Sequence, residues 1–296
     1  MRRVSDPSSA DVPALGSEIG PAPQRWEARG VGWRRVACLV GLVVLIGGCG
    51  GSSSRSSGSG AATGTAATKR PPPSLLILGD SIVETQDTPC QCPAGVAMFA
   101  HRIGARLTDQ SNAGSTARDL LDQVKTDSFV RQLIRHADDI VVSMGLNDLP
   151  WNRPDLCAVG NPPTVRWAGV TERCIRRAAA AFERTMNATL TEIDALRRGK
   201  PTTLRWLDAY NTVIGDHVDA GYGSAAAVKA SEAAVSRFDA IQCRLAAAHG
   251  GRCVDIERTF NGARGSHPAR RYLSADYTHP NANGQQLIAG DLLAAR

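Results

Sequence analysis

The sequence predicts an α/β fold in which helices cover both faces of a parallel sheet. From Ser74 onward, short apolar runs alternate with longer stretches of helical character. Two of the runs, 74–78 and 139–144, are apolar almost throughout, which is typical of strands buried on both faces. The alternation indicates successive βαβ units. No apolar run approaches the roughly 20 residues of a membrane-spanning helix, which excludes a protein that crosses the membrane repeatedly.

The expected elements follow one another in a regular order. The expected strands are 74–78, 139–144, 202–207 and 252–256, and the expected helices are 95–107, 116–134, 171–198, 224–248 and 283–295. The last two strands have the weaker patterns. In open parallel sheets, functional groups gather beyond the carboxyl ends of the strands. Residues that directly follow a strand are therefore the first candidates for a site.

The first 48 residues have the pattern of an export signal. Arg34 and Arg35 precede the apolar run 36–46, and two glycines lead to Cys49. The Ile-Gly-Gly-Cys end of this segment resembles the lipobox of bacterial lipoproteins, in which the cysteine is acylated. An ordinary cleaved signal or an uncleaved short anchor would fit the same pattern. We expect an exported protein, either secreted or held at the cell surface by a lipid on Cys49.

Residues 49–73 have the composition of a tether. They consist mostly of Gly, Ser, Ala and Thr, which form flexible chains, and they end in three prolines. The predicted organisation is therefore a signal peptide with an extended n-region (1–48), a linker (49–73) and one folded domain (74–296). Residues 1–73 also hold five of the six net positive charges. The folded domain is nearly neutral, so we expect no nucleic acid partner.

Six cysteines fall within the expected domain: Cys90, Cys92, Cys157, Cys174, Cys243 and Cys253. In an exported domain, six cysteines suggest three disulfides. We favour pairing between neighbours in the sequence, 157 with 174 and 243 with 253, which leaves 90 with 92. A zinc half-site at 90 and 92 is the alternative, but no second pair of ligands has matching spacing.

Three polar motifs are placed at or near strand ends, where their residues should meet at one edge of the sheet. Ser81, in Gly79-Asp80-Ser81, offers a hydroxyl, and a helix starting behind it would favour negative charge nearby. Gly114, in Asn112-Ala-Gly, allows a close approach and leaves its N–H free. Asn147 can donate from its side-chain amide. Each motif alone would also fit an ordinary turn.

Asp276 and His279 precede the last expected helix. Their spacing lets the carboxylate accept the Nδ1–H of the imidazole, which fixes the tautomer whose Nε2 can take up a proton. Metal binding by these two residues is an alternative, but the spacing suggests no third ligand. We expect no metal.

Together, the motifs resemble the four blocks of the SGNH (GDSL-type) hydrolases, over residues 74–294. The resemblance implies a flavodoxin-like, three-layer α/β/α fold with a five-stranded parallel sheet in the order 2-1-3-4-5. It also implies hydrolysis of carboxylic esters. Ile82 stands where the family's nickname has leucine. A Gly-x-Ser-x-Gly motif is absent around Ser81, which argues against the unrelated α/β-hydrolase fold.

The resemblance also implies the site residues. They are Ser81, Asp276 and His279 as the catalytic set, with Ser81, Gly114 and Asn147 as the oxyanion hole. Such a mechanism needs no metal and no organic cofactor. We expect Asp80 and Asp148 to be structural, because a carboxylate beside the oxyanion would oppose the developing charge.

We therefore expect an exported serine esterase or lipase that acts, as a monomer, on a small-molecule, lipid or glycan ester. A carbohydrate O-acetylesterase or an acyltransferase is compatible with the same fold. A surface binding protein on a hydrolase scaffold is the alternative from another class, and the intact Ser81, Asp276 and His279 argue against it.

The stretch 149–170 is long for a loop in such a fold and contains Trp151 and Trp167. We expect it to wall the substrate pocket, pinned by a bridge from Cys157 to Cys174. Plain surface packing of the two indoles is the alternative.

Overall fold

The computed structural model describes residues 71–157, 169–214 and 224–295. These residues form a five-stranded, all-parallel sheet in the order β2-β1-β3-β4-β5. The strands are β1 (Ser74–Gly79), β2 (Arg106–Asp109), β3 (Asp139–Ser143), β4 (Thr203–Leu207) and β5 (Arg252–Val254). The predicted fold class and strand order are confirmed.

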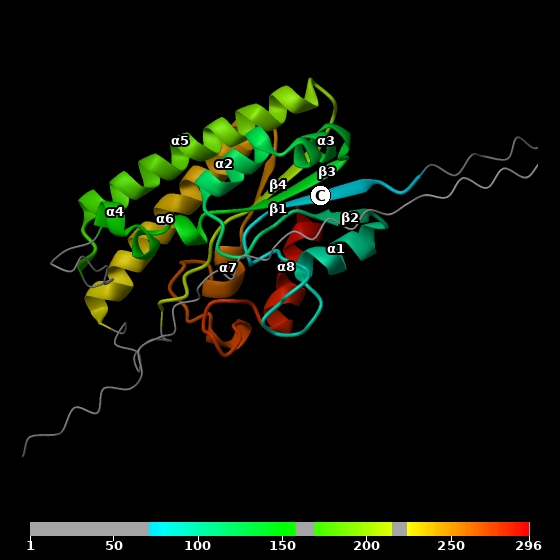
Figure 1. The fold of residues 1–296 in the computed structure, drawn as a ribbon. Coiled ribbons are helices and arrows are strands. Elements are labelled where there is room, and N and C mark those ends of the chain that lie inside the picture. Colours follow the sequence, from blue (N-terminus) through cyan, green and yellow to red (C-terminus); the bar gives the residue numbers. More distant parts are fainter. Residues whose placement is uncertain (1–70, 158–168, 215–223, 296) are drawn as a thin grey trace, which may run out of the picture. The chain divides into compact units, whose positions relative to one another are not determined.

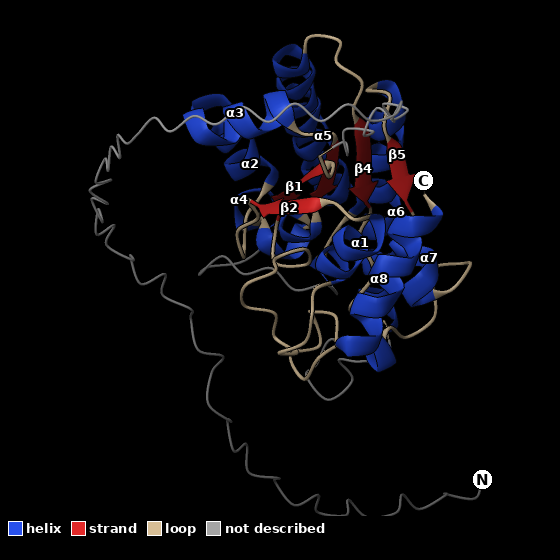
Figure 2. Ribbon diagram, turned by 90° about the vertical axis from the view of Figure 1, so that its right-hand side faces the viewer, coloured by secondary structure: helices blue, strands red, loops and turns tan. Residues whose placement is uncertain are grey.

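Helices cover both faces of this sheet (Figure 1). One layer holds α2 (Ala117–Thr126), α3 (Ser128–His136), α5 (Glu172–Arg197) and α6 (Ala225–Ala248), and the other holds α1 (Gly95–Ile103), α7 (Ile256–Asn261) and α8 (Ala282–Ala294). A short helix, α4 (Pro154–Cys157), and three 3-10 turns (Leu146–Asp148, Pro150–Asn152 and Arg270–Tyr272) complete the described elements. Figure 2 shows the strands in red among the blue helices of the two layers.

The edge strand β2 has no counterpart among the strand ranges predicted from the sequence. The expected helix 95–107 is too long, because Gly104 takes a left-handed conformation (φ 65°) and ends α1 at Ile103. The chain then enters β2, which has only four residues and pairs only with β1. None of the four is buried, so no apolar run marks the strand.

Aspartates set two further boundaries that differ from the predictions. The expected helix 116–134 is two helices, because the Asp127 carboxylate accepts the N–H groups of Phe129 (2.8 Å) and Val130 (3.1 Å) and starts α3. The expected strand 252–256 ends at Val254, because Asp255 caps α7.

Two consecutive residues of β4 contact helices of opposite layers. Trp206 lies 6.1 Å from the Phe182 ring of α5, centroid to centroid. Arg205 belongs to the opposite face, where it bonds Asp139 of β3 (2.7 Å) and its guanidinium lies over the Phe99 ring of α1. The charge of Arg205 is thus paired although its side chain is buried. One strand therefore fixes both layers relative to the sheet.

β1 and β3 approach each other closely at their carboxyl ends because of Gly79. Its φ is +155°, and a Cβ atom there would collide with the backbone carbonyl of Ser143. The chain continues beside β3 for one more residue, with the Asp80 N–H bonded to the Ser143 carbonyl (3.1 Å). Glycine at this position therefore allows Ser81 to leave the sheet directly beyond the end of the strand.

Three disulfides join Cys90 to Cys92, Cys157 to Cys174 and Cys243 to Cys253. These are the pairs that the sequence favoured. The bond between Cys90 and Cys92 leaves no free thiolate for the alternative zinc half-site. The second bridge ties α4 to α5, and the third ties α6 to β5.

Some predictions concern residues outside the described ranges. The leader 1–48, Cys49, residues 50–70 of the linker, and Trp167 all lie there. Within the described residues, no helix has both the length and the apolar character needed to cross a bilayer.

Candidate active site

Polar residues that follow neighbouring strands meet at the carboxyl edge of the sheet. The chain passes back beside β1 after β2, where the Asn112 N–H bonds the Gly79 carbonyl (2.9 Å). This contact brings the Gly114 turn next to the turn that carries Ser81. Residues 81–83 make a turn, and α1 begins at Gly95, the start predicted for the helix 95–107.

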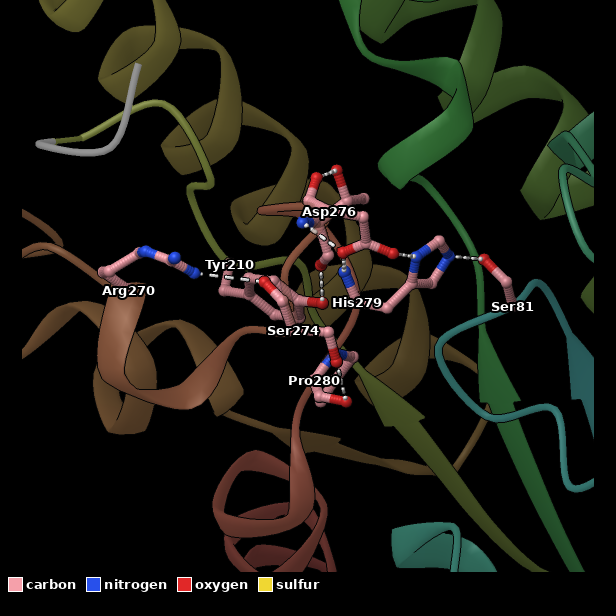
Figure 3. A network of polar contacts seen from close by, with 8 residues as sticks. Ser81, Tyr210, Arg270, Ser274, Asp276, His279 and Pro280 are labelled. Atoms are coloured by element: carbon pink, nitrogen blue, oxygen red, sulfur yellow. Dashed lines mark hydrogen bonds and ion pairs between the residues drawn. The ribbon is translucent and has the colours of Figure 1, made fainter. Parts of the chain in front are cut away.

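Ser81, His279 and Asp276 form a continuous hydrogen-bonded line (Figure 3). The His279 Nε2 atom lies 2.8 Å from the Ser81 hydroxyl oxygen. The His279 Nδ1 atom lies 2.7 Å from Asp276 Oδ2. All three predicted catalytic residues are therefore brought together, in the order hydroxyl, imidazole, carboxylate. The imidazole is mostly buried and the carboxylate is more exposed.

The Asp276 carboxylate also closes its own turn. Its Oδ1 atom accepts the backbone N–H groups of Thr278 (3.0 Å) and His279 (3.0 Å). Partial burial by itself would raise the pKa of Asp276, but these two N–H groups and the imidazole outweigh it and lower the pKa. The carboxylate is therefore ionised, as a partner for an imidazolium should be.

Hydrogen bonds link the turns that hold the three predicted oxyanion-hole residues. Gly114 has a left-handed backbone (φ 77°), and the part of the chain that the structure describes offers no acceptor for its N–H or for that of Ser81. The Asn147 amide donates one N–H to the Ser115 carbonyl (3.0 Å), which ties the β3 end to the Gly114 turn. A primary amide has a second N–H, so Asn147 keeps one donor for another acceptor.

Asp80 and Asp148 are buried and bonded to backbone N–H groups, as expected for structural residues. Asp80 accepts the Ile82 N–H (3.1 Å) and the Ser143 hydroxyl (3.2 Å), and Asp148 accepts the Ala117 N–H (2.9 Å) at the start of α2. Burial raises the pKa of each carboxyl to about 7. A cavity of about 10 Å³ beside Asp80 has no room for a substrate.

The residues after β4 were not among the predicted site residues. Asp208 accepts the N–H groups of Ile256 (2.7 Å) and Glu257 (3.0 Å), and Tyr210 donates to the Thr278 carbonyl (2.6 Å). Burial raises the pKa of Asp208 to about 8. The one sequence signal for this segment is its position directly after the expected strand 202–207.

One group of potential metal ligands occurs among the described residues. Asp208, Cys243 and Cys253 lie close together, but the two cysteines are bonded to each other. The group therefore offers a single carboxylate, which does not make a metal site.

The described part of the loop 149–170 lies against the domain. Trp151 is half-buried and packs on the hydrophobic core, and the bridge to Cys174 is present. The predicted role of this loop as a pocket wall rests largely on 158–168, which lie outside the described residues.

A protein-family model, the GDSL-like lipase/acylhydrolase family, matches residues 77–287. The match runs from within β1 to within α8 and includes the predicted catalytic and oxyanion-hole residues. No curated protein sequence matches the chain.

Several solved structures share the fold. A lipase from a goat rumen metagenome has a TM-score of 0.59 at 18% identity, with 75% of this chain and 97% of that chain covered. An acetylxylan esterase from Geobacillus stearothermophilus has a TM-score of 0.51 at 17% identity, with 75% and 93% covered. Two further structures are catalytic mutants of that esterase, with a serine or a histidine replaced by alanine.

The buried Asp80 predicts a pH-dependent stability. Its folded pKa of about 7 lies above the ordinary 3.8, so the folded state binds the proton more tightly and its stabilisation declines as the pH rises from about 4 to 7. Asp80→Asn stays neutral. The unfolding free energy of this variant, relative to that of the wild type, should therefore be about 3 kcal/mol more favourable to folding at pH 8 than at pH 5. Thermal denaturation at both pH values measures the gain.

Asp87→Asn is the matched control, because Asp87 is exposed in the same loop. Its difference from the wild type should be the same at both pH values. An equally constant difference for Asp80→Asn would contradict the prediction.

Proposed function

The chain belongs to the GDSL-like lipase/acylhydrolase family, and we propose that it is a serine-dependent carboxylic ester hydrolase with Ser81 as the nucleophile. The observation that carries the proposal is the line from Ser81 through His279 to Asp276, with separations of 2.8 and 2.7 Å. An imidazole bonded to a hydroxyl on one side and to a carboxylate on the other is the arrangement that activates a serine. The related fold of an esterase whose catalytic mutants replace a serine and a histidine supports the same pair.

Acylation begins with proton transfer from the Ser81 hydroxyl to His279. Asp276 holds the tautomer with hydrogen on Nδ1, so Nε2 has the free lone pair that accepts this proton. The hydroxyl oxygen attacks the ester carbonyl, and its electrons pass to the carbonyl oxygen. The intermediate collapses with cleavage of the bond to the alcohol, which leaves with the proton from His279. The acyl group remains on Ser81.

The negative oxygen of the intermediate needs hydrogen-bond donors that are already in place. The N–H groups of Ser81 and Gly114 and the second N–H of Asn147 supply them in this proposal. Fixed donors of this kind commonly contribute 10²–10³ each to the rate. The neutral forms of Asp80 and Asp148 below about pH 7 support the assignment, because they put no negative charge next to the oxyanion.

Water then releases the acid. As the water attacks the acyl-enzyme, His279 accepts a proton from the water. His279 then donates that proton to the Ser81 oxygen as the bond between Ser81 and the acyl group breaks. The cycle returns every group to its starting state. None of these steps calls for a metal or an organic cofactor.

A carbohydrate O-acetylesterase is the second candidate, favoured by the fold shared with an acetylxylan esterase. Hydrolysis of p-nitrophenyl esters from acetate to palmitate, measured together with acetate release from acetylated polysaccharide, separates it from a lipase. A lipase prefers the long acyl chains, and an acetylesterase is restricted to the shortest ones.

We also propose that the enzyme is exported and held at the membrane by a lipid on Cys49. The arginine-flanked apolar run 36–46 and the Gly/Ser-rich linker support this proposal. The three disulfides support it as well, because structural disulfides persist in oxidising compartments.

Covalent labelling tests the nucleophile. A fluorophosphonate probe should label the folded wild-type enzyme and should not label Ser81→Ala, because the probe needs the activated hydroxyl. Ser236→Ala, an exposed serine on α6, is the control and should be labelled like the wild type. Absence of labelling in the folded wild-type protein would favour the non-catalytic binding protein.

Asn147 tests the oxyanion hole. Asn147→Ala should lower kcat by about 10²–10³ with little change in KM, because the lost donor serves the intermediate more than the bound ester. Asn283→Ala, at an exposed position of α8, should keep the wild-type kcat. Steady-state kinetics on a p-nitrophenyl ester give both values. An unchanged kcat in Asn147→Ala would remove this residue from the oxyanion hole.

Cell fractionation tests the anchor. The full-length protein should be found with the membranes, and Cys49→Ser should be released from them, because only the cysteine can take the lipid. Cys38→Ser changes the same side chain inside the leader and should fractionate like the wild type. Immunoblots of the two fractions measure the distribution, and equal behaviour of both variants would contradict lipidation at Cys49.

A further inference from the structure

The segment 208–211, which follows β4, is buried and makes hydrogen bonds to several neighbouring elements. The Ala209 N–H donates to Asp239 (3.0 Å), and the Asn211 N–H donates to Asn261 (2.8 Å). The Asn211 side chain bonds the Ser231 hydroxyl (2.9 Å). These groups come from α6 and α7, so the segment is fixed to both helix layers.

Tyr210 extends from this fixed segment to the turn that carries His279. Its hydroxyl donates to the Thr278 carbonyl at 2.6 Å. Its ring is buried and stacks on Phe260 (4.4 Å, 17°), which in turn contacts Tyr272. Burial, together with the charges of Asp80 and Asp276, raises the pKa of Tyr210, so the phenol keeps its proton.

The turn 276–279 behaves as one unit because its own hydrogen bonds close it. Asp276 holds the N–H groups of Thr278 and His279, and the His279 carbonyl accepts the Ser274 N–H (2.7 Å). Hydrogen bonds from His279 to Ser81 and from Tyr210 to Thr278 join this unit to the end of the sheet. A shift of the Thr278 carbonyl would therefore move the imidazole.

We propose that Tyr210 is a positioning residue that sets the distance between His279 and Ser81. The inference rests on the proposed function, since it gives the imidazole a role in turnover. The phenol contacts the Thr278 carbonyl, one residue before His279, and acts through the backbone. Proton transfer and attack depend steeply on such distances, and a misplacement of about 1 Å can cost about 10² in rate.

Tyr210→Phe tests the proposal, because it removes only the hydroxyl. We expect kcat, and the rate of fluorophosphonate labelling, to fall about tenfold with KM nearly unchanged. 4-Aminophenylalanine at position 210 restores a donor and should recover most of the lost kcat. A merely structural tyrosine would change the melting temperature and leave the kcat of the folded enzyme as it was.

Tyr272→Phe is the matched control. Tyr272 lies in the same group of rings, and no hydrogen bond between described residues uses its hydroxyl. This variant should keep the wild-type kcat. The proposal is overturned if Tyr210→Phe keeps the wild-type kcat, or if it loses cooperative unfolding, since the hydroxyl would then hold the fold and not the imidazole. Failure of the proposed function would appear separately, as a folded wild-type protein that the probe does not label.

Discussion

One hydrogen bond, between the Ser81 hydroxyl and His279 Nε2, joins residues 198 positions apart in the chain. It forms because two separate parts of the chain meet at the carboxyl edge of the sheet. The end of β1 positions Ser81 there, and the turn before α8 positions His279. α8 packs against α1, so the C-terminal helix is fixed relative to the chain that follows β1. The sheet and this helix layer must both be in place before the two side chains can meet.

The carboxyl edge of the sheet also holds buried acidic residues near the proposed oxyanion hole. Three aspartates, Asp80, Asp148 and Asp208, follow the ends of strands. Each accepts a hydrogen bond from at least one backbone N–H group. Burial of these three side chains raises the pKa of each carboxyl group. A large fraction of the carboxyl groups is therefore protonated near neutral pH. Protonated carboxyls connect turns by hydrogen bonds without adding a field that opposes negative charge on a substrate.

The sequence predicted the features that depend on local pattern. Buried strands such as β1 and β3 have continuous apolar runs, and the motifs around Ser81 and His279 have recognisable residue types. The edge strand β2 was missed because it pairs with only one strand and its residues are partly exposed. Such a strand does not need a continuous apolar run. Tyr210 was missed for another reason: it bonds a backbone carbonyl 68 residues away, and a carbonyl has no residue type that a sequence could reveal.

The long separation between the two ends of the catalytic line has a consequence for biosynthesis. A ribosome makes Ser81 198 residues before His279, so a growing or stalled chain carries the Ser81 hydroxyl without its imidazole partner. Under the proposed mechanism, such a chain cannot yet attack an ester. Under the same mechanism, the chemistry needs the turn before α8 in place, so it waits until nearly the whole domain has been made.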